Sequence, residues 1–167
     1  VGRKGYWQFK MLVIKLDSVG NMLWQKQFFS GLSDRANAVV KTNDGGAVIT
    51  GRIYNPINLS YSAVLFKINS IGNITWAKSL NGFLDGGYSV VDANGGAYVV
   101  AGLSTSNPPQ ILFTKVDSTG AVYWSTQIGG LGDINYLPGR GLIRTFDNGF
   151  AFACSENNFG AGGSDAY

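Results

Sequence analysis

One block of sequence occurs three times along the chain, and this repetition constrains the fold more than any other feature. Each copy has the form Lys-x-Asx-Ser-x-Gly, and a tryptophan follows four residues after the glycine. The copies span 15–24, 67–76 and 115–124, so their tryptophans are 52 and 48 residues apart. A fixed period of about 50 residues is typical of proteins assembled from similar supersecondary units that stack on one another.

Two further blocks recur in register with the first. A turn segment rich in Asx and Gly occurs at 43–46, 94–96 and 147–149, and a lone aspartate recurs at Asp34, Asp85 and Asp133. These turns separate runs of apolar and β-branched residues, four runs to a period. Asx-Gly turns between such runs are the strongest short-range signal of a β-hairpin. No window of about ten residues has the apolar spacing of a helix. The sequence therefore predicts an all-β protein with four antiparallel strands per period.

The repeated Lys-x-Asx-Ser-x-Gly block is predicted to form a tight turn at the end of a strand. Its Asx residue stands at a strand end, where a short side chain can bond the backbone two residues further on. Its glycine accepts a positive φ at low cost. The structural repeat positions are Asp17, Asn69 and Asp117; Gly20, Gly72 and Gly120; and Trp24, Trp76 and Trp124.

Composition excludes several function classes. Only 14% of the residues are charged and Glu156 is the single glutamate, whereas helical surfaces are usually rich in Glu and Lys. The chain contains no histidine, so histidine-based acid–base or triad catalysis cannot occur within it. A lone cysteine, Cys154, excludes an internal disulfide and a cysteine-rich zinc site. We expect no enzyme activity and no cofactor.

Charge and hydropathy also limit the partners. The net charge of +3 comes from scattered Lys and Arg residues, whereas a nucleic-acid interface needs them clustered. The apolar runs are far shorter than the roughly 20 residues that cross a bilayer. We therefore expect neither nucleic-acid binding nor a membrane span. A surface poor in charge and rich in Asn, Ser, Thr and Gly favours an extracellular or cell-surface protein.

Four antiparallel strands in each period of 40–50 residues are the pattern of a β-propeller blade. A single four-stranded sheet cannot bury both of its faces, whereas sheets stacked on each other can. The inner strands should then be apolar on both faces, as in the near-continuous runs 11–14 and 98–101. A β-helix or another solenoid is the main alternative, although its rungs are usually shorter.

The blocks resemble the propeller repeats of large bacterial and archaeal cell-surface proteins, with their Lys-Leu-Asp-x-x-Gly-x-x-x-Trp and Asp-Gly-Gly segments. The resemblance covers nearly the whole chain from about Lys10. The tryptophan-docking motif of quinoprotein-type propellers, Ala-x-Asp-x-x-x-Gly-x-x-x-Trp, is more distant, because this chain has one residue fewer between Asp and Gly and has Lys in place of Ala. The resemblance implies that the Asp-x-x-Gly turn joins the third and fourth strands of a blade, with the tryptophan on the outer, fourth strand.

This strand order divides the chain into about three blade equivalents. They are a half blade at 10–29, whole blades at 36–80 and 87–128, and part of a blade at 140–167, which stops in mid-strand at Tyr167. Closed propellers have four to eight blades, so this partial propeller needs other blades of the same chain or of another chain. We expect a piece of a longer protein. The alternative is completion by a partner, in which two copies would give six blades.

The repeated aromatic and acidic residues have a structural and a functional interpretation. One tryptophan per period suits packing between blades, and the alternative is a ring of sugar-stacking platforms. The aspartates at 34, 85 and 133 are expected in the loop after the fourth strand, either capping it or forming a ring of carboxylates for a cation such as Ca²⁺. No Asp-x-Asp-x-Asp segment is present, so no metal is predicted. The lysines of the repeated block, at 15, 67 and 115, are expected to be solvated, or to lie along the strand with only the ammonium group in water.

Unrepeated loop sequence is where such a protein usually carries specificity. Candidate ligand or partner residues are Tyr54 and Tyr61 in the segment 53–62, Tyr136 and Arg140 in the segment 135–141, and Trp7, which lies outside the repeat. We expect a non-catalytic structural or interaction module that contacts a cell-surface protein or a glycan. The alternatives are a carbohydrate-binding propeller and a fragment of a quinone-dependent propeller enzyme.

Overall fold

The computed structural model describes residues 9–29, 33–57, 59–107, 109–128, 141–156 and 165–166. Within these residues all regular structure is β-strand, and the strands pair in antiparallel sheets. The predicted all-β class is confirmed. The described part of the chain contains no helix long and apolar enough to cross a bilayer.

Two complete sheets of four strands form the middle of the molecule, one for each full period. The strands of the first are β3 (Arg35–Lys41), β4 (Ala47–Asn55), β5 (Ser60–Ile68) and β6 (Ile74–Leu80). Those of the second are β7 (Phe83–Asp92), β8 (Tyr98–Ser104), β9 (Ile111–Val116) and β10 (Val122–Ile128). In both sheets the spatial order follows the sequence, as expected for strands joined by hairpins.

The start of the second sheet differs from the expected 87. β7 begins at Phe83, which is buried and pairs with Ser104. The pairing of β7 with β8 then shifts register on both sides of Gly87. With these irregularities, β7 extends on the N-terminal side of its apolar run. The apolar run alone therefore predicts a start that is too late in the sequence.

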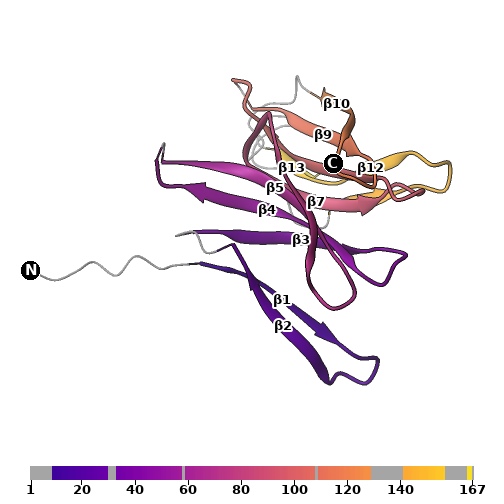
Figure 1. Cartoon of the computed structure of the whole chain (residues 1–167). Helices are drawn as coiled ribbons and strands as arrows, with labels where there is room; N and C mark the ends of the chain where they lie inside the picture. Colours follow the sequence, from indigo (N-terminus) through magenta and orange to yellow (C-terminus); the bar gives the residue numbers. More distant parts are fainter. Residues whose placement is uncertain are drawn as a thin grey trace, which may run out of the picture.

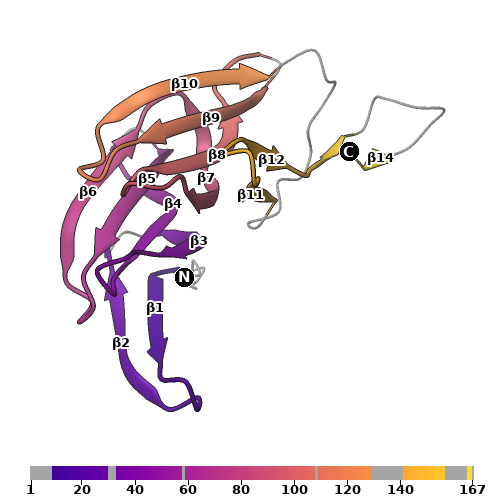
Figure 2. The same ribbon diagram turned by 90° about the vertical axis from the view of Figure 1, so that its right-hand side faces the viewer.

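Shorter sheets flank the two complete ones. β1 (Met11–Leu16) pairs with β2 (Met22–Phe28), and β11 (Leu142–Arg144) pairs with β12 (Phe150–Phe152). Two residues each form β13 (Ser155–Glu156) and β14 (Asp165–Ala166), which also pair. Successive sheets overlap in Figure 1, and Figure 2 shows that they follow an arc, with β2, β6 and β10 outside and β3, β7 and β11 inside. The arc is open, because no described strand joins the free edges of β1 and β12.

The core is divided among the junctions between neighbouring sheets. Neighbouring residues of one strand pack into different junctions: Val48 and Leu65 face the second complete sheet, whereas Ile49 and Phe66 face the β1–β2 sheet. A third cluster joins the second complete sheet to Leu142 on β11. Alternate side chains of a strand point to opposite faces, so the inner strands bury both of their faces. Their apolar runs are near-continuous because both faces are buried.

The repeated turns have the geometry that the sequence predicts. The backbone N–H of Val19 donates to Oδ1 of Asp17 at 3.0 Å, and Asn69 and Asp117 accept the equivalent bonds from the residues two further on. The glycines of the three turns have φ values of 91°, 77° and 81°. A residue with a β-carbon would be strained there.

Candidate functional site: the junctions between sheets

The tryptophans of the first two repeats each dock on the repeated turn of the next sheet. Nε1 of Trp24 donates to the carbonyl oxygen of Ser70 at 3.3 Å, and Nε1 of Trp76 donates to that of Ser118 at 2.8 Å. The indole rings also lie against the turn glycines, since a β-carbon at Gly72 would be 3.0 Å from Cη2 of Trp24. We call this arrangement the tryptophan latch.

Lysines surround the first latch. Nζ of Lys15 donates to the same Ser70 carbonyl at 3.0 Å, and Nζ of Lys26 donates to Oδ1 of Asn73 at 2.8 Å. The turn of one sheet is thus held by three side chains of the preceding sheet. The side chain of Lys67, the repeated lysine of the second block, is 17% exposed, and its ammonium group forms an ion pair with Asp44 at 2.7 Å.

Trp124 differs from the other two repeated tryptophans. It lies on β10, the outer strand of the last complete sheet, and its side chain is 39% exposed. Among the described residues none accepts a hydrogen bond from its indole.

A polar and aromatic cluster lies at the other end of the junction between the complete sheets. We call it the Arg52 cluster. Arg52 on β4 forms an ion pair with Asp85, which also accepts a hydrogen bond from the hydroxyl of Tyr88 at 3.0 Å. Burial, and then the neighbouring Asp85, raise the pKa of Tyr88 to about 12. The guanidinium carbon of Arg52 is 4.0 Å from the ring centroid of Tyr61. The cluster therefore ties β4 and β5 to β7.

The structure corrects the expected placement of three candidates in this cluster. Asp85 lies within β7 rather than in a loop, because β7 begins at Phe83. Tyr54 and Tyr61 lie in β4 and β5 and are paired residues, with ring centroids 5.2 Å apart. The strands β4 and β5 extend beyond their apolar residues, so the loop that connects them is shorter than predicted.

Asp34 immediately precedes β3 and is buried. Its Oδ1 accepts a hydrogen bond from the backbone N–H of Tyr54 at 3.0 Å, and its own N–H donates to Phe9 at 3.0 Å. The structure thus brings Asp34, Tyr54, Tyr61 and Asp85 to one region, joined by Arg52. Sequence reasoning missed Arg52, because it belongs to no repeated block.

The remaining candidates, Trp7, Asp133, Tyr136 and Arg140, lie outside the described residues. In the part of the chain that the structure describes, no group of three or more Cys, Asp or Glu side chains could hold a metal ion.

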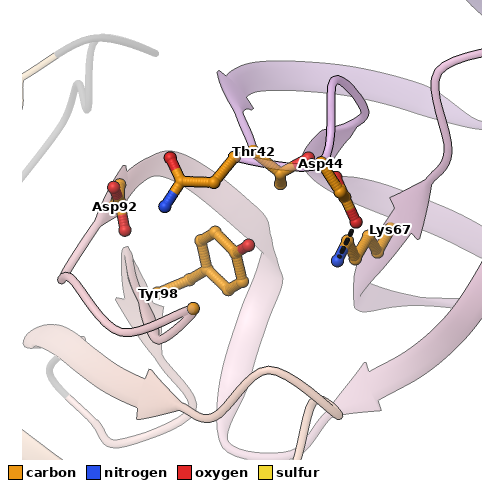
Figure 3. Close-up of a pocket in the computed structure, with 7 residues that line it drawn as sticks. Thr42, Asp44, Lys67, Asp92 and Tyr98 are labelled. Carbon is orange, nitrogen blue, oxygen red and sulfur yellow. Dashed lines mark hydrogen bonds and ion pairs between the residues drawn. The ribbon is translucent and has the colours of Figure 1, made fainter.

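A pocket of about 190 Å³ lies between the turn ends of the two complete sheets. Figure 3 shows the ring of Tyr98 between Asp92 and the Asp44–Lys67 pair. Hydrogen bonds from Lys67 and then Thr42 hold the pKa of Asp44 well below its usual range. Burial raises the pKa of Tyr98. Asp92 accepts a hydrogen bond from the N–H of Asn94 at 3.0 Å. The two carboxylates that line the pocket, Asp44 and Asp92, thus accept hydrogen bonds from residues of the turns that form it.

A scan of family models finds no match to the chain, and a search of curated proteins finds none either.

Proposed function

We propose that the sheets are blades of a β-propeller and that the chain is a non-catalytic structural and interaction module of a secreted or cell-surface protein. The observation that carries the proposal is the tryptophan latch, which recurs with the same donor atom and the equivalent serine carbonyl at two successive junctions. Sheets that each dock on the next sheet through the same contact can form a longer array by repetition. Its natural partners are therefore other blades.

The use of the charged side chains supports a structural role. The Arg52–Asp85 and Lys67–Asp44 pairs both lie at the junction of the two complete sheets. A catalytic site keeps its acid or base within reach of a substrate. Here the carboxylates of Asp85 and Asp44 bind basic partners in the chain itself, and the only glutamate of the sequence is Glu156.

The carbohydrate-binding alternative needs aromatic faces that are open to a sugar. The face of Tyr61 is covered by Arg52, and its ring also meets that of Tyr54. The hydroxyl of Tyr61 donates to Oγ of Ser33 at 3.3 Å. These contacts favour a structural role for the two tyrosines over sugar stacking.

A crystal structure of the chain tests the blade arrangement. We expect the sheets to be arranged radially about one axis, with β3 and β7 nearest to it. Sheets stacked along a straight axis, as in a solenoid, would contradict the proposal.

Glycan-array binding tests the functional part. We expect the wild-type chain to bind no glycan, and Tyr54→Ala and Tyr61→Ala variants to behave alike. Binding that either substitution abolishes would replace the interaction module with a carbohydrate-binding protein. A quinone absorbance band in the purified protein would point instead to the enzyme alternative.

A further inference from the structure

Asparagine is followed directly by glycine at three positions of the chain, and this pair favours loss of the side-chain amide. The pairs are Asn81–Gly82, Asn94–Gly95 and Asn148–Gly149. The backbone nitrogen of the glycine can attack Cγ of the asparagine, because glycine has no β-carbon to hinder the approach. Asparagine is accordingly among the thermolabile residues of proteins. The structure gives the three pairs different hydrogen-bond environments.

The backbone N–H of Gly149 is held by the carboxylate of Asp147. It donates to Oδ1 of Asp147 at 3.1 Å, and the hydroxyl of Thr145 donates to the same oxygen. A hydrogen bond to an ionised acceptor is stronger than one between neutral groups. The nitrogen must lose this proton before it attacks, and the negative charge beside it opposes that loss.

The same bonds occur in the first complete sheet and are missing from the second. In the first sheet, Oδ1 of Asp44 accepts hydrogen bonds from the hydroxyl of Thr42 and from the N–H of Gly46. The backbone bond that closes each turn places Ala93 and Gly95 at the positions of Thr42 and Asp44. The turn of the second sheet therefore lacks both the hydroxyl and the carboxylate.

The glycine nitrogens at 82 and 95 are open to the reaction. Among the described residues, no group accepts a hydrogen bond from the backbone N–H of Gly82 or Gly95. Asn81 and Asn94 are both exposed. Exposure of Asn94 is a property of its position in the repeat, because the equivalent Asn43 is exposed with a complete sheet beside it.

We propose that Asn81 and Asn94 are sites of spontaneous deamidation and that Asp147 protects Asn148. The glycine nitrogen loses its proton to a base of the solvent and forms a bond to Cγ of the asparagine. The Cγ–Nδ2 bond breaks, the amide nitrogen takes up a proton and leaves as ammonia, and a succinimide ring remains. Water then opens the ring at either carbonyl, which gives aspartate or isoaspartate. Since water is the only co-reactant, the reaction depends on neither the blade arrangement nor a partner.

At Asn94 the product changes both the charge and the length of the turn. Oδ1 of Asp92 accepts a hydrogen bond from the N–H of Asn94 at 3.0 Å, so the new carboxylate forms next to an existing one. The net charge of the chain falls from +3 to +2 when one amide is lost. Isoaspartate also lengthens the backbone inside the turn that the 2.9 Å bond from Ala93 to Ala97 closes. Deamidation at this position therefore loosens the hairpin of β7 and β8.

Peptide mapping by mass spectrometry follows each amide in the full chain. In the folded chain at mildly alkaline pH, Asn81 and Asn94 should lose their amides at least about tenfold faster than Asn148, where a bond to a carboxylate must first break. In the urea-unfolded chain the three rates should be similar, since glycine follows each asparagine. Equal rates at Asn94 and Asn148 in the folded chain would overturn the proposal. Amides at 81 and 94 that persist while the unfolded chain loses them would overturn it as well.

Removal of the Asp147 carboxylate tests the protection directly. In the folded Asp147→Ala chain, Asn148 should lose its amide about tenfold faster than in the wild type, and the rate at Asn94 should not change. Asp117→Ala is the matched control, because it removes the aspartate of another turn and should leave the rate at Asn148 unchanged. An Asn148 rate that Asp147→Ala does not raise would overturn the protective role.

A conservative substitution separates the hydrogen bond from a general loosening of the turn. Asp147→Asn keeps an oxygen that can accept the Gly149 N–H, as Oδ1 of Asn69 accepts a backbone N–H in its own turn. It should therefore keep part of the protection, with an Asn148 rate between those of the wild type and Asp147→Ala. A rate equal to that of Asp147→Ala would show that the hydrogen bond does not protect Asn148 and would overturn this part of the proposal.

Discussion

The third and fourth strands of each sheet share one turn but have different surroundings. β5 buries residues on both faces, because sheets lie on either side of it, whereas β6 exposes most of its side chains. The same contrast separates β9 from β10, which is exposed along its whole length. The inner strands therefore hold the core, and the outer strand is attached mainly through its turn, its strand pairing and one tryptophan. Four substitution experiments test this division.

The largest effect is expected in the inner strands. Phe66→Ala removes a fully buried ring whose centroid lies 5.3 Å from that of Phe28 and 5.1 Å from that of Phe29. The free energy of unfolding, measured by urea denaturation, should fall by about 3–5 kcal/mol. The control is Ile74→Ala on the outer strand β6, where the side chain is half exposed and the loss should be about 1 kcal/mol or less. Equal losses of stability in the two variants would contradict the division between inner and outer strands.

Substitutions of polar residues should show the same difference between inner and outer strands, with smaller losses in the free energy of unfolding. Asp85→Ala leaves the mostly buried guanidinium of Arg52 without its carboxylate. A hydrogen bond to a charged group contributes about 1.5–3 kcal/mol, and we expect a loss in that range in the same denaturation experiment. Lys26→Ala on the outer strand β2 removes an exposed bond to Asn73 and should change stability by less than about 0.5 kcal/mol. An Asp85→Ala variant as stable as Lys26→Ala would show that the Arg52 cluster does not bind the sheets together.

The tryptophan latch is the exception on the outer strand. Trp76→Phe keeps an aromatic ring but removes the bond to the Ser118 carbonyl, and should cost about 1 kcal/mol. The control is Thr75→Val, the neighbouring residue, whose hydroxyl makes an exposed 3.3 Å bond to Lys67. Its loss should be within about 0.5 kcal/mol. Equal free energies of unfolding for the two variants would show that the indole N–H does not hold the sheets together.

The sequence predicts the repeated strands and turns, but it predicts few of the contacts that occur only once. The strands and turns follow from the spacing of Asx and Gly, because those residues act locally through the backbone. The position at which a tryptophan docks could not be predicted, since the Ser70 carbonyl lies 46 residues from Trp24 in sequence. The Arg52–Asp85 pair was missed because Arg52 belongs to no repeated block and lies 33 residues from Asp85 in the sequence. The start of β7 was misplaced because its pairing depends on register shifts around Gly87.

The smallest effect concerns the turns that join inner and outer strands, and it appears as a dependence on pH. Hydrogen bonds, above all from Asn21 to Asp17 and from Thr119 to Asp117, lower the pKa of both carboxyls below the ordinary 3.8. The unfolded chain then takes up protons first as the pH falls. The stability from these turns is therefore full above about pH 5 and is lost as the pH falls through 3.8 and below.

Since the chain has no histidine, we expect little change in the free energy of unfolding between about pH 5 and 8. Asn69 supplies a natural control, because its Oδ1 accepts the same bonds, from Ile71 at 3.2 Å and Asn73 at 2.9 Å, without titrating. An Asp17→Asn, Asp117→Asn double variant should keep both turns and lose less stability on acidification than the wild type. Urea denaturation at pH 7 and at pH 3 measures the difference. An acid sensitivity equal to that of the wild type would assign the effect to other carboxylates, of which Asp44, bonded to Lys67 on the inner strand β5, is the first to test.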